Sequence, residues 1–198
     1  EVINVRENVG LIEVANFAKH EFKGPEARKF LDHILAGKLP KPGRISLSPM
    51  LTYRGKLYGD LTVACLDENE FMVFGSGAAQ EMHRRWFENH LSKFKVQYKN
   101  RSDEFHGISI AGPNSRKVLE KIVREDVSNE KFRFRDSRRM FVGGVPAIIN
   151  RISFTGELGY EIYVAPHYQL KLFEEIMEAG KEFDIKPFGG RALMSMRL

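Results

Sequence analysis

The chain has 198 residues, of which 42% are hydrophobic and 29% are charged, and its net charge is +5. These values predict one or two globular domains, and they exclude a disordered or low-complexity chain. No apolar run approaches the ~20 residues of a membrane span, so we expect no membrane contact. The single cysteine, Cys65, excludes an internal disulfide framework and a cysteine-based zinc site.

Basic residues cluster at positions 93–101 and 133–139. Such clusters suit nucleic acid, an anionic membrane or a polyanionic substrate tail. Acidic residues interleave through most of the chain, and no nucleic-acid motif is present. We therefore interpret both clusters as solvated surface and expect no nucleic-acid partner.

In the first half of the chain, hydrophobic periodicity predicts two helices and three strands. The expected helices cover residues 26–36 and 78–91, and the strands cover residues 48–53, 58–66 and 71–75.

The second half continues with five strands and two helices. The strands are expected at residues 93–99, 107–111, 138–142, 147–154 and 160–164, and the helices at residues 115–124 and 168–183. Because strands outnumber long helices and hairpin-like spacing dominates, we predict an α+β fold with largely antiparallel sheets and flanking helices. The last residue, Leu198, falls within a helix-like run, so we expect a fragment of a longer polypeptide.

One pattern occurs twice. Gly24-Pro25 and Gly112-Pro113 each follow a strand-like run, and two residues later each is followed by Arg-Lys and an apolar pair. Proline suits the first turn of a helix, where no N–H is needed. The pattern predicts a duplication with two related halves, about residues 1–100 and 101–198, whose segments could interleave. Chance is the alternative, since Gly-Pro before a helix is common.

A turn is expected at Thr155-Gly156-Glu157-Leu158-Gly159. Its glycines allow a tight reversal, with the carboxylate of Glu157 at the tip. Such a carboxylate accepts two parallel N–H bonds from a planar heterocycle. An ordinary hairpin with a solvated glutamate fits the same residues.

Asp60 opens the alternating strand Asp60-Leu61-Thr62-Val63, although aspartate is a poor strand residue. Two readings remain: the side chain caps the turn after Gly59, or it points into a pocket.

Several common sites are excluded. Gly75-Ser76-Gly77 stands between a strand and a helix, but Gln80 occupies the third glycine position of a dinucleotide loop. The six histidines have no zinc-ligand spacing, so we expect surface or partly buried structural histidines and no metal. No serine lies in a Gly-x-Ser-x-Gly elbow.

Four segments together resemble the glycine-cleavage T-protein (aminomethyltransferase) family. Residues 54–63 are similar to its Gly-Gly-x-x-x-Asp-Leu segment, and Val9-Gly10-Leu11-Ile12-Glu13-Val14 is similar to its opening strand. Residues 154–161 resemble its Tyr-Thr-Gly-Glu-x-Gly-x-Glu hairpin, and Met194-Ser195-Met196-Arg197-Leu198 resembles its Asp-Ser-Leu-Arg-Leu helix. The segments agree in order and spacing over nearly the whole chain.

A narrower branch is closer still: the C-terminal folate module of dimethylglycine and sarcosine dehydrogenases. The segments that carry this likeness are residues 76–79, 85–87, 109–113, 153–160 and 188–193. The resemblance implies a flavin domain, fused or separate, that holds FAD and oxidises an N-methyl amine. It also implies a folate module that captures the one-carbon unit on tetrahydrofolate. Neither a flavin segment nor the family's C-terminal barrel is present within these 198 residues.

The resemblance assigns roles to individual residues. Asp60 matches the catalytic carboxylate near the folate N5/N10 region, and Glu157 matches the acid that holds the pterin ring. Ser76 matches a position near the ligand where the T-protein usually has asparagine. Tyr160 and Arg151 are further expected contacts of the cofactor.

Two departures limit the match. Leu193 stands where T-proteins have arginine, and Leu47 replaces a tyrosine. Losing a fixed cation argues against glycine cleavage with a lipoylated carrier. We therefore expect the module to capture the one-carbon unit from oxidised dimethylglycine or sarcosine as 5,10-methylenetetrahydrofolate, in the cytoplasm or, in a eukaryote, the mitochondrial matrix. The alternative is a non-catalytic folate-binding regulatory or repair protein of this fold.

Overall fold

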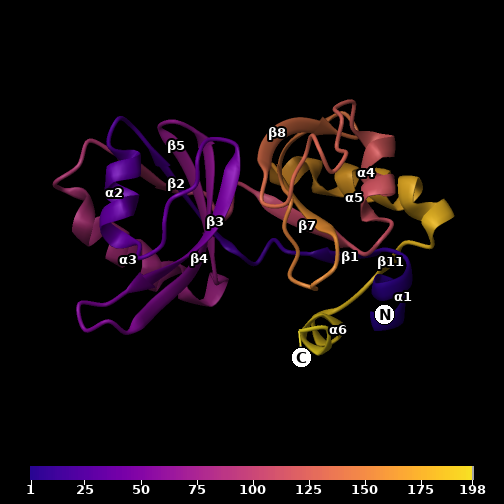
Figure 1. Cartoon of the computed structure of the whole chain (residues 1–198), viewed down its shortest axis with the longest axis horizontal. Helices are drawn as coiled ribbons and strands as arrows, with labels where there is room; N and C mark the ends of the chain where they lie inside the picture. The colour runs from indigo at the N-terminus through magenta and orange to yellow at the C-terminus, as the bar shows by residue number, and fades with distance from the viewer. Residues whose placement is uncertain (198) are drawn as a thin grey trace. The chain divides into compact units, whose positions relative to one another are not determined.

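The computed structural model describes residues 1–197 and divides the chain into two compact units. Unit 1 comprises Glu1–Ala15 and Phe105–Leu198, and unit 2 comprises Asn16–Glu104 (Figure 1). The first residues of the chain therefore pack with its second half. Leu198, the end of the expected helix-like run, lies outside the described residues. Within the described part, no helix is both long and apolar enough to cross a bilayer.

Unit 1 is built on a sheet with strand order β11-β1-β7-β10-β9-β8 within residues 1–197. Only the β1–β11 pair is parallel among these neighbours. The strands are β1 Gly10–Glu13, β7 His106–Ala111, β8 Ser137–Val142, β9 Val145–Asn150, β10 Gly159–Val164 and β11 Lys186–Pro187. The helices are α1 Val2–Glu7, α4 Ser115–Ile122, α5 Gln169–Gly180 and α6 Gly190–Ser195, with short 3-10 turns η2 Pro166–Tyr168 and η3 Lys181–Phe183.

The core of unit 1 lies between this sheet and helices α4 and α5. Alternate strand residues such as Ile108, Ile110 and Ile162 meet Leu119 and Ile176 of the helices there. Because alternate residues of a strand face opposite sides, the odd-numbered residues of β10 face away from these helices. A second cluster, at the end of the sheet, packs Val5, Ala111, Phe188 and Met196 together and anchors α1 and α6.

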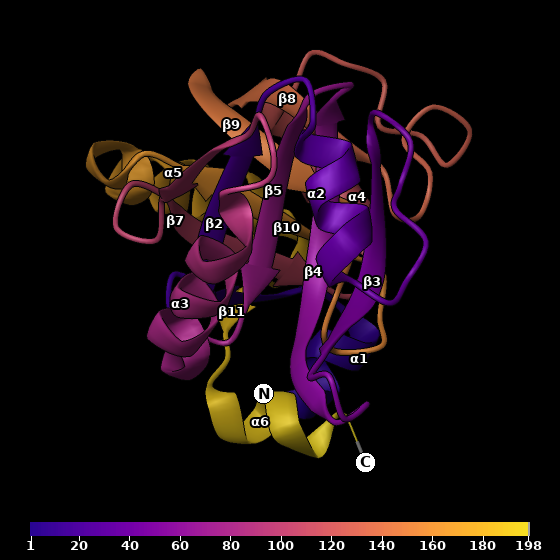
Figure 2. The ribbon, with the colours of Figure 1, turned by 90° about the vertical axis from the view of Figure 1, so that its left-hand side faces the viewer.

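Unit 2 has an antiparallel sheet in the order β3-β4-β5-β2-β6 within the described residues. Its strands are β2 Ala18–Lys23, β3 Arg44–Leu51, β4 Leu57–Asp67, β5 Glu70–Gly75 and β6 Gln97–Asn100. Its helices are α2 Ala27–Ile34 and α3 Gln80–Leu91, the latter preceded by the 3-10 turn η1 Gly77–Ala79. Figure 2 shows α2 and α3 on the same face of the sheet, where they enclose a core around Phe22, Phe30 and Phe87.

The predicted α+β class with largely antiparallel sheets and flanking helices is confirmed. Two strand predictions were too long. The strand expected at 147–154 ends at Asn150, because the pairing of β9 with β10 stops at Glu161–Asn150. The strand expected at 93–99 begins only at Gln97, where pairing with β2 starts. Helix α1 and strand β11 were not expected from the sequence.

The repeated Gly-Pro pattern adopts the same geometry in both units. Gly24 has a φ of 133° and Gly112 a φ of 131°, both in the region that favours glycine. Each glycine carbonyl accepts a bond from the first helical N–H three residues on, at 3.0 Å for both Ala27 and Ser115. Each helix then has eight residues. A strand thus turns into a helix in the same way twice, although duplication itself stays a prediction.

Two histidines are buried more deeply than the sequence led us to expect. His20 and His83 are 0% and 2% exposed, and their ring centroids are 6.4 Å apart. Burial, followed by the neighbouring His83, lowers the pKa of His20 to about 4, against a smaller opposing effect of Glu81. The ring of His83 lies under β4 and β5, and its Nε2 donates to the Tyr58 carbonyl at 3.2 Å.

A buried carboxyl lies on the other face of the unit 1 sheet. Glu161 of β10 is 8% exposed, and the Tyr163 hydroxyl donates to its Oε2 at 2.8 Å. Burial raises the pKa of Glu161 to about 7, although the hydrogen bond from Tyr163 acts in the opposite direction. Between pH 4.5 and about 7, the folded chain therefore keeps a proton on Glu161 that the unfolded chain has lost.

We predict that Gly59→Ala destabilises the protein by about 1–3 kcal/mol, the usual effect of overpacking a core. A Cβ at position 59 would lie 2.8 Å from Nε2 of His83 and 3.3 Å from the Met50 methyl carbon. Urea denaturation measures the loss. Gly190→Ala is the control, because its Cβ would meet nothing within 4 Å. Equal midpoints for the two variants would contradict the packing described.

We also predict a pH dependence of stability that Glu161→Gln removes. A folded-state pKa of about 7 against 4.5 in the unfolded chain means that stability falls as pH rises from 4.5 to 7 and is constant above. The total effect is up to about 3 kcal/mol. The free energy of unfolding of both proteins, measured across this range, isolates Glu161 from other titrating groups. Parallel pH profiles would disprove the shift.

Candidate functional site

Asp60 lies within strand β4, opposite Pro49 of β3. Its neighbours Gly59 and Leu61 are buried on the helix side, so the carboxylate is on the opposite face and is exposed. It makes no hydrogen bond or ion pair with residues 1–197, and therefore it does not cap the preceding turn. An unpaired carboxylate on a strand is free to bind a ligand.

Ser76 directly follows β5 and is exposed. The β4–β5 pairing ends with Thr62 opposite Phe74, and Asp60 and Ser76 each lie two residues beyond that pair. The fold therefore brings these two expected residues to the same end of the unit 2 sheet. Leu47, at the position of the family's tyrosine, pairs with Thr62 on the same face.

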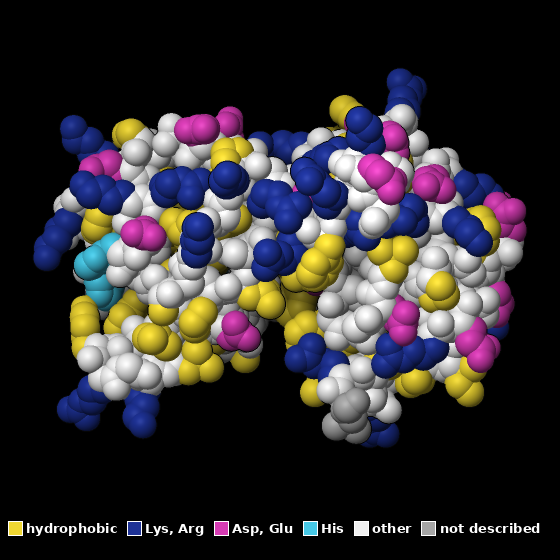
Figure 3. Space-filling view, viewed as in Figure 1, with side chains coloured by type: hydrophobic (Ala, Val, Ile, Leu, Met, Phe, Trp, Pro, Cys, Tyr) yellow, Lys and Arg dark blue, Asp and Glu magenta, His cyan; other side chains and the backbone are white. Residues whose placement is uncertain are grey.

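Apolar side chains surround this end of the sheet. Figure 3 shows them gathered at the lower left of the view, where β3 and β4 form their hairpin. The exposed members are Leu47, Leu51 and Leu57, whereas the exposed Tyr53 packs on Trp86 and His90 of α3, on the helix side. Asp60 thus lies beside a surface that suits an apolar or aromatic ligand moiety.

Glu157 lies in the connection between β9 and β10, which spans residues 151–158. This connection is longer than the tight reversal expected, because β9 ends early. Gly156 has a φ of 81°, as the turn prediction required. Gly159 is needed for a different reason: a Cβ there would lie 2.8 Å from the Ile110 carbonyl oxygen.

The carboxylate of Glu157 is bound by a residue that the sequence did not single out. Nη1 of Arg6, on α1, is 2.5 Å from Glu157 Oε1, and the two side chains are 40% and 26% exposed. Among the residues that the structure describes, no hydrogen bond reaches Oε2. No local pattern could have identified Arg6, because it lies 151 positions from its partner and on a helix that was not predicted.

Tyr160 is buried completely in the core of unit 1. Its ring stacks on Phe132 at a centroid distance of 5.9 Å, and its hydroxyl accepts a bond from Arg116 Nε at 3.1 Å. Burial raises the pKa of Tyr160, while Arg116 acts in the opposite direction. These contacts support a packing role, and a direct contact with ligand stays a prediction.

Arg151 is 7% exposed. Its Nη1 donates to the Phe132 carbonyl, and its Nη2 donates to Asn129 Oδ1 at 2.7 Å. Burial lowers its pKa. Arg151 therefore holds the segment around Phe132 in place, and its contact with a ligand also stays a prediction.

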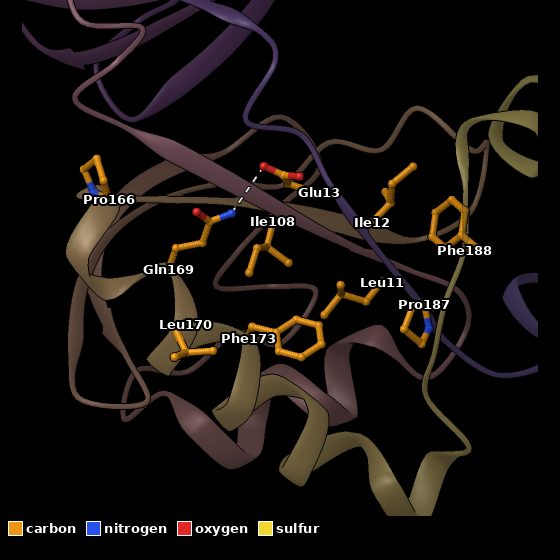
Figure 4. A pocket seen from close by; sticks show the side chains of 10 residues that line it. All are labelled: Leu11, Ile12, Glu13, Ile108, Pro166, Gln169, Leu170, Phe173, Pro187 and Phe188. Atoms are coloured by element: carbon orange, nitrogen blue, oxygen red, sulfur yellow. Dashed lines mark hydrogen bonds between the residues drawn. The ribbon is translucent and has the colours of Figure 1, made fainter.

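Unit 1 also contains a groove of about 560 Å³ between β1, β11 and the start of α5 (Figure 4). Its walls are mostly apolar, and at one end Gln169 Nε2 donates to Glu13 Oε1 at 3.3 Å. Neither Glu157, Tyr160 nor Arg151 lines it. Within residues 1–197, no group of three or more His, Cys, Asp or Glu side chains could hold a metal ion.

Comparison with known proteins agrees with this arrangement. The model of the GCVT N-terminal domain matches residues 1–198. A mouse (Mus musculus) protein named dimethylglycine dehydrogenase, mitochondrial, is 38% identical over all of this chain, which covers 23% of that protein. An aminomethyltransferase of Thermoanaerobacter pseudethanolicus is 31% identical over 98% of the chain, which covers 53% of that protein. The chain thus spans a quarter to a half of these relatives.

The fold has a close counterpart among solved structures. The glycine cleavage system aminomethyltransferase T from Bartonella henselae superposes with a TM-score of 0.87 and 22% identity. The superposition covers 99% of this chain and 52% of that protein. Because the family model and the curated relatives extend over essentially all of the sequence, the chain belongs to the GCVT N-terminal domain family.

Proposed function

We propose that the chain is a tetrahydrofolate-binding, aminomethyltransferase-like module. It captures a one-carbon unit from oxidised N-methylglycines, dimethylglycine or sarcosine, as 5,10-methylenetetrahydrofolate. The observation that carries the proposal is that Asp60 presents an exposed carboxylate and Glu157 a partly exposed one, each from a segment that resembles a motif of the family to which the chain belongs.

Glu157 is the proposed anchor of the pteridine ring. A reduced pteridine presents adjacent N–H donors along one edge, and an ionised carboxylate accepts two such bonds in parallel. In this chain Oε1 accepts one bond from Arg6 and keeps a second lone pair, and Oε2 has no partner among the described residues, so both oxygens can still accept a bond. The residues present therefore fit the group.

Asp60 is the proposed catalytic carboxylate. Its charge stabilises an iminium derived from the oxidised methylamine, or it moves a proton at the reacting nitrogen. Bound tetrahydrofolate supplies the nucleophilic nitrogens that accept the carbon. Because Asp60 is held in a paired strand, its backbone is fixed while the carboxylate remains free. The hydroxyl of Ser76, at the same end of the sheet, is the proposed hydrogen-bonding neighbour.

The source of the one-carbon unit is proposed to be a flavin domain, fused or separate, that holds FAD. The likeness to a mouse dimethylglycine dehydrogenase supports this partner, since the chain covers only 23% of that protein. The choice between dimethylglycine and sarcosine depends on contacts with the amine, and the cytoplasm or mitochondrial matrix is the proposed compartment.

We predict that Glu157→Gln weakens tetrahydrofolate binding by about 10- to 100-fold, because a charge-assisted acceptor is lost. Calorimetric titration of the intact parent protein measures the dissociation constant. Glu182→Gln is the matched control, because it breaks a comparable exposed ion pair with Lys121. No binding of tetrahydrofolate to the wild-type protein would refute the proposed function.

We predict that Asp60→Asn leaves tetrahydrofolate binding within about threefold of wild type. Formation of 5,10-methylenetetrahydrofolate should fall by about 10²- to 10⁴-fold, the usual contribution of a proton-transferring group. Product formation by the parent protein, supplied with its methylamine substrate, measures the loss. Asp67→Asn is the control, because Asp67 is an exposed carboxylate at the other end of β4. Tight binding without any one-carbon transfer by the wild-type protein would favour the non-catalytic alternative.

A further inference from the structure

Arg6 connects three parts of unit 1. Its Nη1 donates to Glu157 Oε1 at 2.5 Å and to the Thr155 carbonyl at 3.2 Å, and its Nη2 donates to the Met196 carbonyl at 3.1 Å. One guanidinium from α1 therefore binds both the 151–158 connection and the end of α6. Only arginine offers a planar fork of donors that serves several acceptors at once.

The helix that carries Arg6 is fixed against the end of the sheet. Val5 is fully buried, and its carbonyl lies so close to Gly112 that a Cβ there would approach it to 2.6 Å. Asn4 Nδ2 donates to the Val9 carbonyl at 2.9 Å and to the Asp184 carbonyl at 3.1 Å. A helix that is itself fixed therefore carries the guanidinium. A residue can position another group only if its own backbone is held in place.

The side chain of Glu157 has fewer restraints than the backbone of the segment that carries it. Its backbone is held at Phe154, whose carbonyl accepts from Arg197 Nη1 at 3.3 Å, and at Leu158, whose carbonyl accepts from the Gly112 N–H at 2.8 Å. Between these points Gly156 has a positive φ, and among the described residues the Glu157 carboxylate has Arg6 as its one hydrogen-bond partner. A glutamate side chain there rotates about three bonds and loses entropy when a ligand fixes it. The bond from Arg6 to Oε1 removes much of that freedom before ligand binds.

We infer that Arg6 is a positioning residue for ligand binding: it holds Oε1 of Glu157 so that Oε2 is presented to the N–H edge of a planar heterocycle. This inference rests on the proposed function for the identity of that heterocycle, a reduced pteridine. Arg6 itself does not touch the ligand, and its effect on affinity passes through the carboxylate.

The test is a double-mutant cycle in the parent protein. Arg6→Gln weakens tetrahydrofolate binding by about tenfold, which corresponds to about 1.4 kcal/mol. Arg6→Lys, which keeps the charge but not the fork, recovers part of that loss. In the Glu157→Gln background, Arg6→Gln causes no further loss. Equal losses in both backgrounds would overturn the inference, since Arg6 would then act independently of Glu157.

Asn4→Ala separates positioning from general support of α1. It removes two bonds between the same helix and its surroundings but touches neither Glu157 nor Thr155. We expect it to lower the thermal midpoint while tetrahydrofolate affinity stays within twofold of wild type. A loss of affinity as large as that of Arg6→Gln would show that helix stability alone is responsible.

Hydrogen exchange gives a readout that does not require folate. Arg6→Gln should increase amide exchange in residues 153–158, and Asn4→Ala should leave that segment unchanged. Unchanged exchange in Arg6→Gln would overturn the inference even if the protein binds tetrahydrofolate. If the wild-type protein binds no tetrahydrofolate but exchange rises as expected, the proposed function fails while the restraint on Glu157 stands.

Discussion

The missing side chain of Gly112 is the constraint on which unit 1 depends. With a φ of 131° the chain turns from β7 into the approach to α4, and the space a Cβ would fill is occupied by the backbone of α1 and of the two residues that follow it. The carbonyl oxygens of Val5 and Asn8 would lie within 2.6 Å of that Cβ. The place of α1, and therefore of Arg6 and the carboxylate it binds, follows from this close approach.

In unit 2, two glycines likewise leave space for a neighbouring group. Gly59 and Gly75 on β4 and β5 leave room for the ring of His83, which packs beneath both strands. Asp60 and Ser76 each follow one of these glycines in the chain. The ring thus lies directly behind the backbone that presents the two polar side chains, and burial, which lowers the pKa of His83, favours its neutral form there. A neutral ring supports the strand ends without placing a positive charge behind the carboxylate.

Much of the fold could be predicted from local patterns. Alternating apolar residues identified strands β3 to β10 but not β11, and Gly-Pro identified the corners before α2 and α4. The ends of the helices and strands were harder to predict. Residues 151–154 keep a strand-like composition, but no neighbouring strand within residues 1–197 pairs with them. The end of β9 is therefore set by its pairing with β10 in the folded protein and not by local composition.

For the candidate site, sequence could indicate residues but not their contacts. Asp60 was anomalous as a charge in an apolar strand, and Glu157 stood out between two glycines. Arg6 carried no signal, because an arginine near the start of a chain is ordinary until the distant loop that it binds is known. The contacts that bury Tyr160 and Arg151 around Phe132 were equally inaccessible, since they join segments far apart along the chain.

The most direct measurement is a crystal structure of the parent protein with a stable reduced folate bound. We predict that the N–H edge of the pteridine lies within about 3 Å of the Glu157 carboxylate, with Arg6 still on Oε1. A pteridine bound elsewhere, with Glu157 facing solvent, would contradict it.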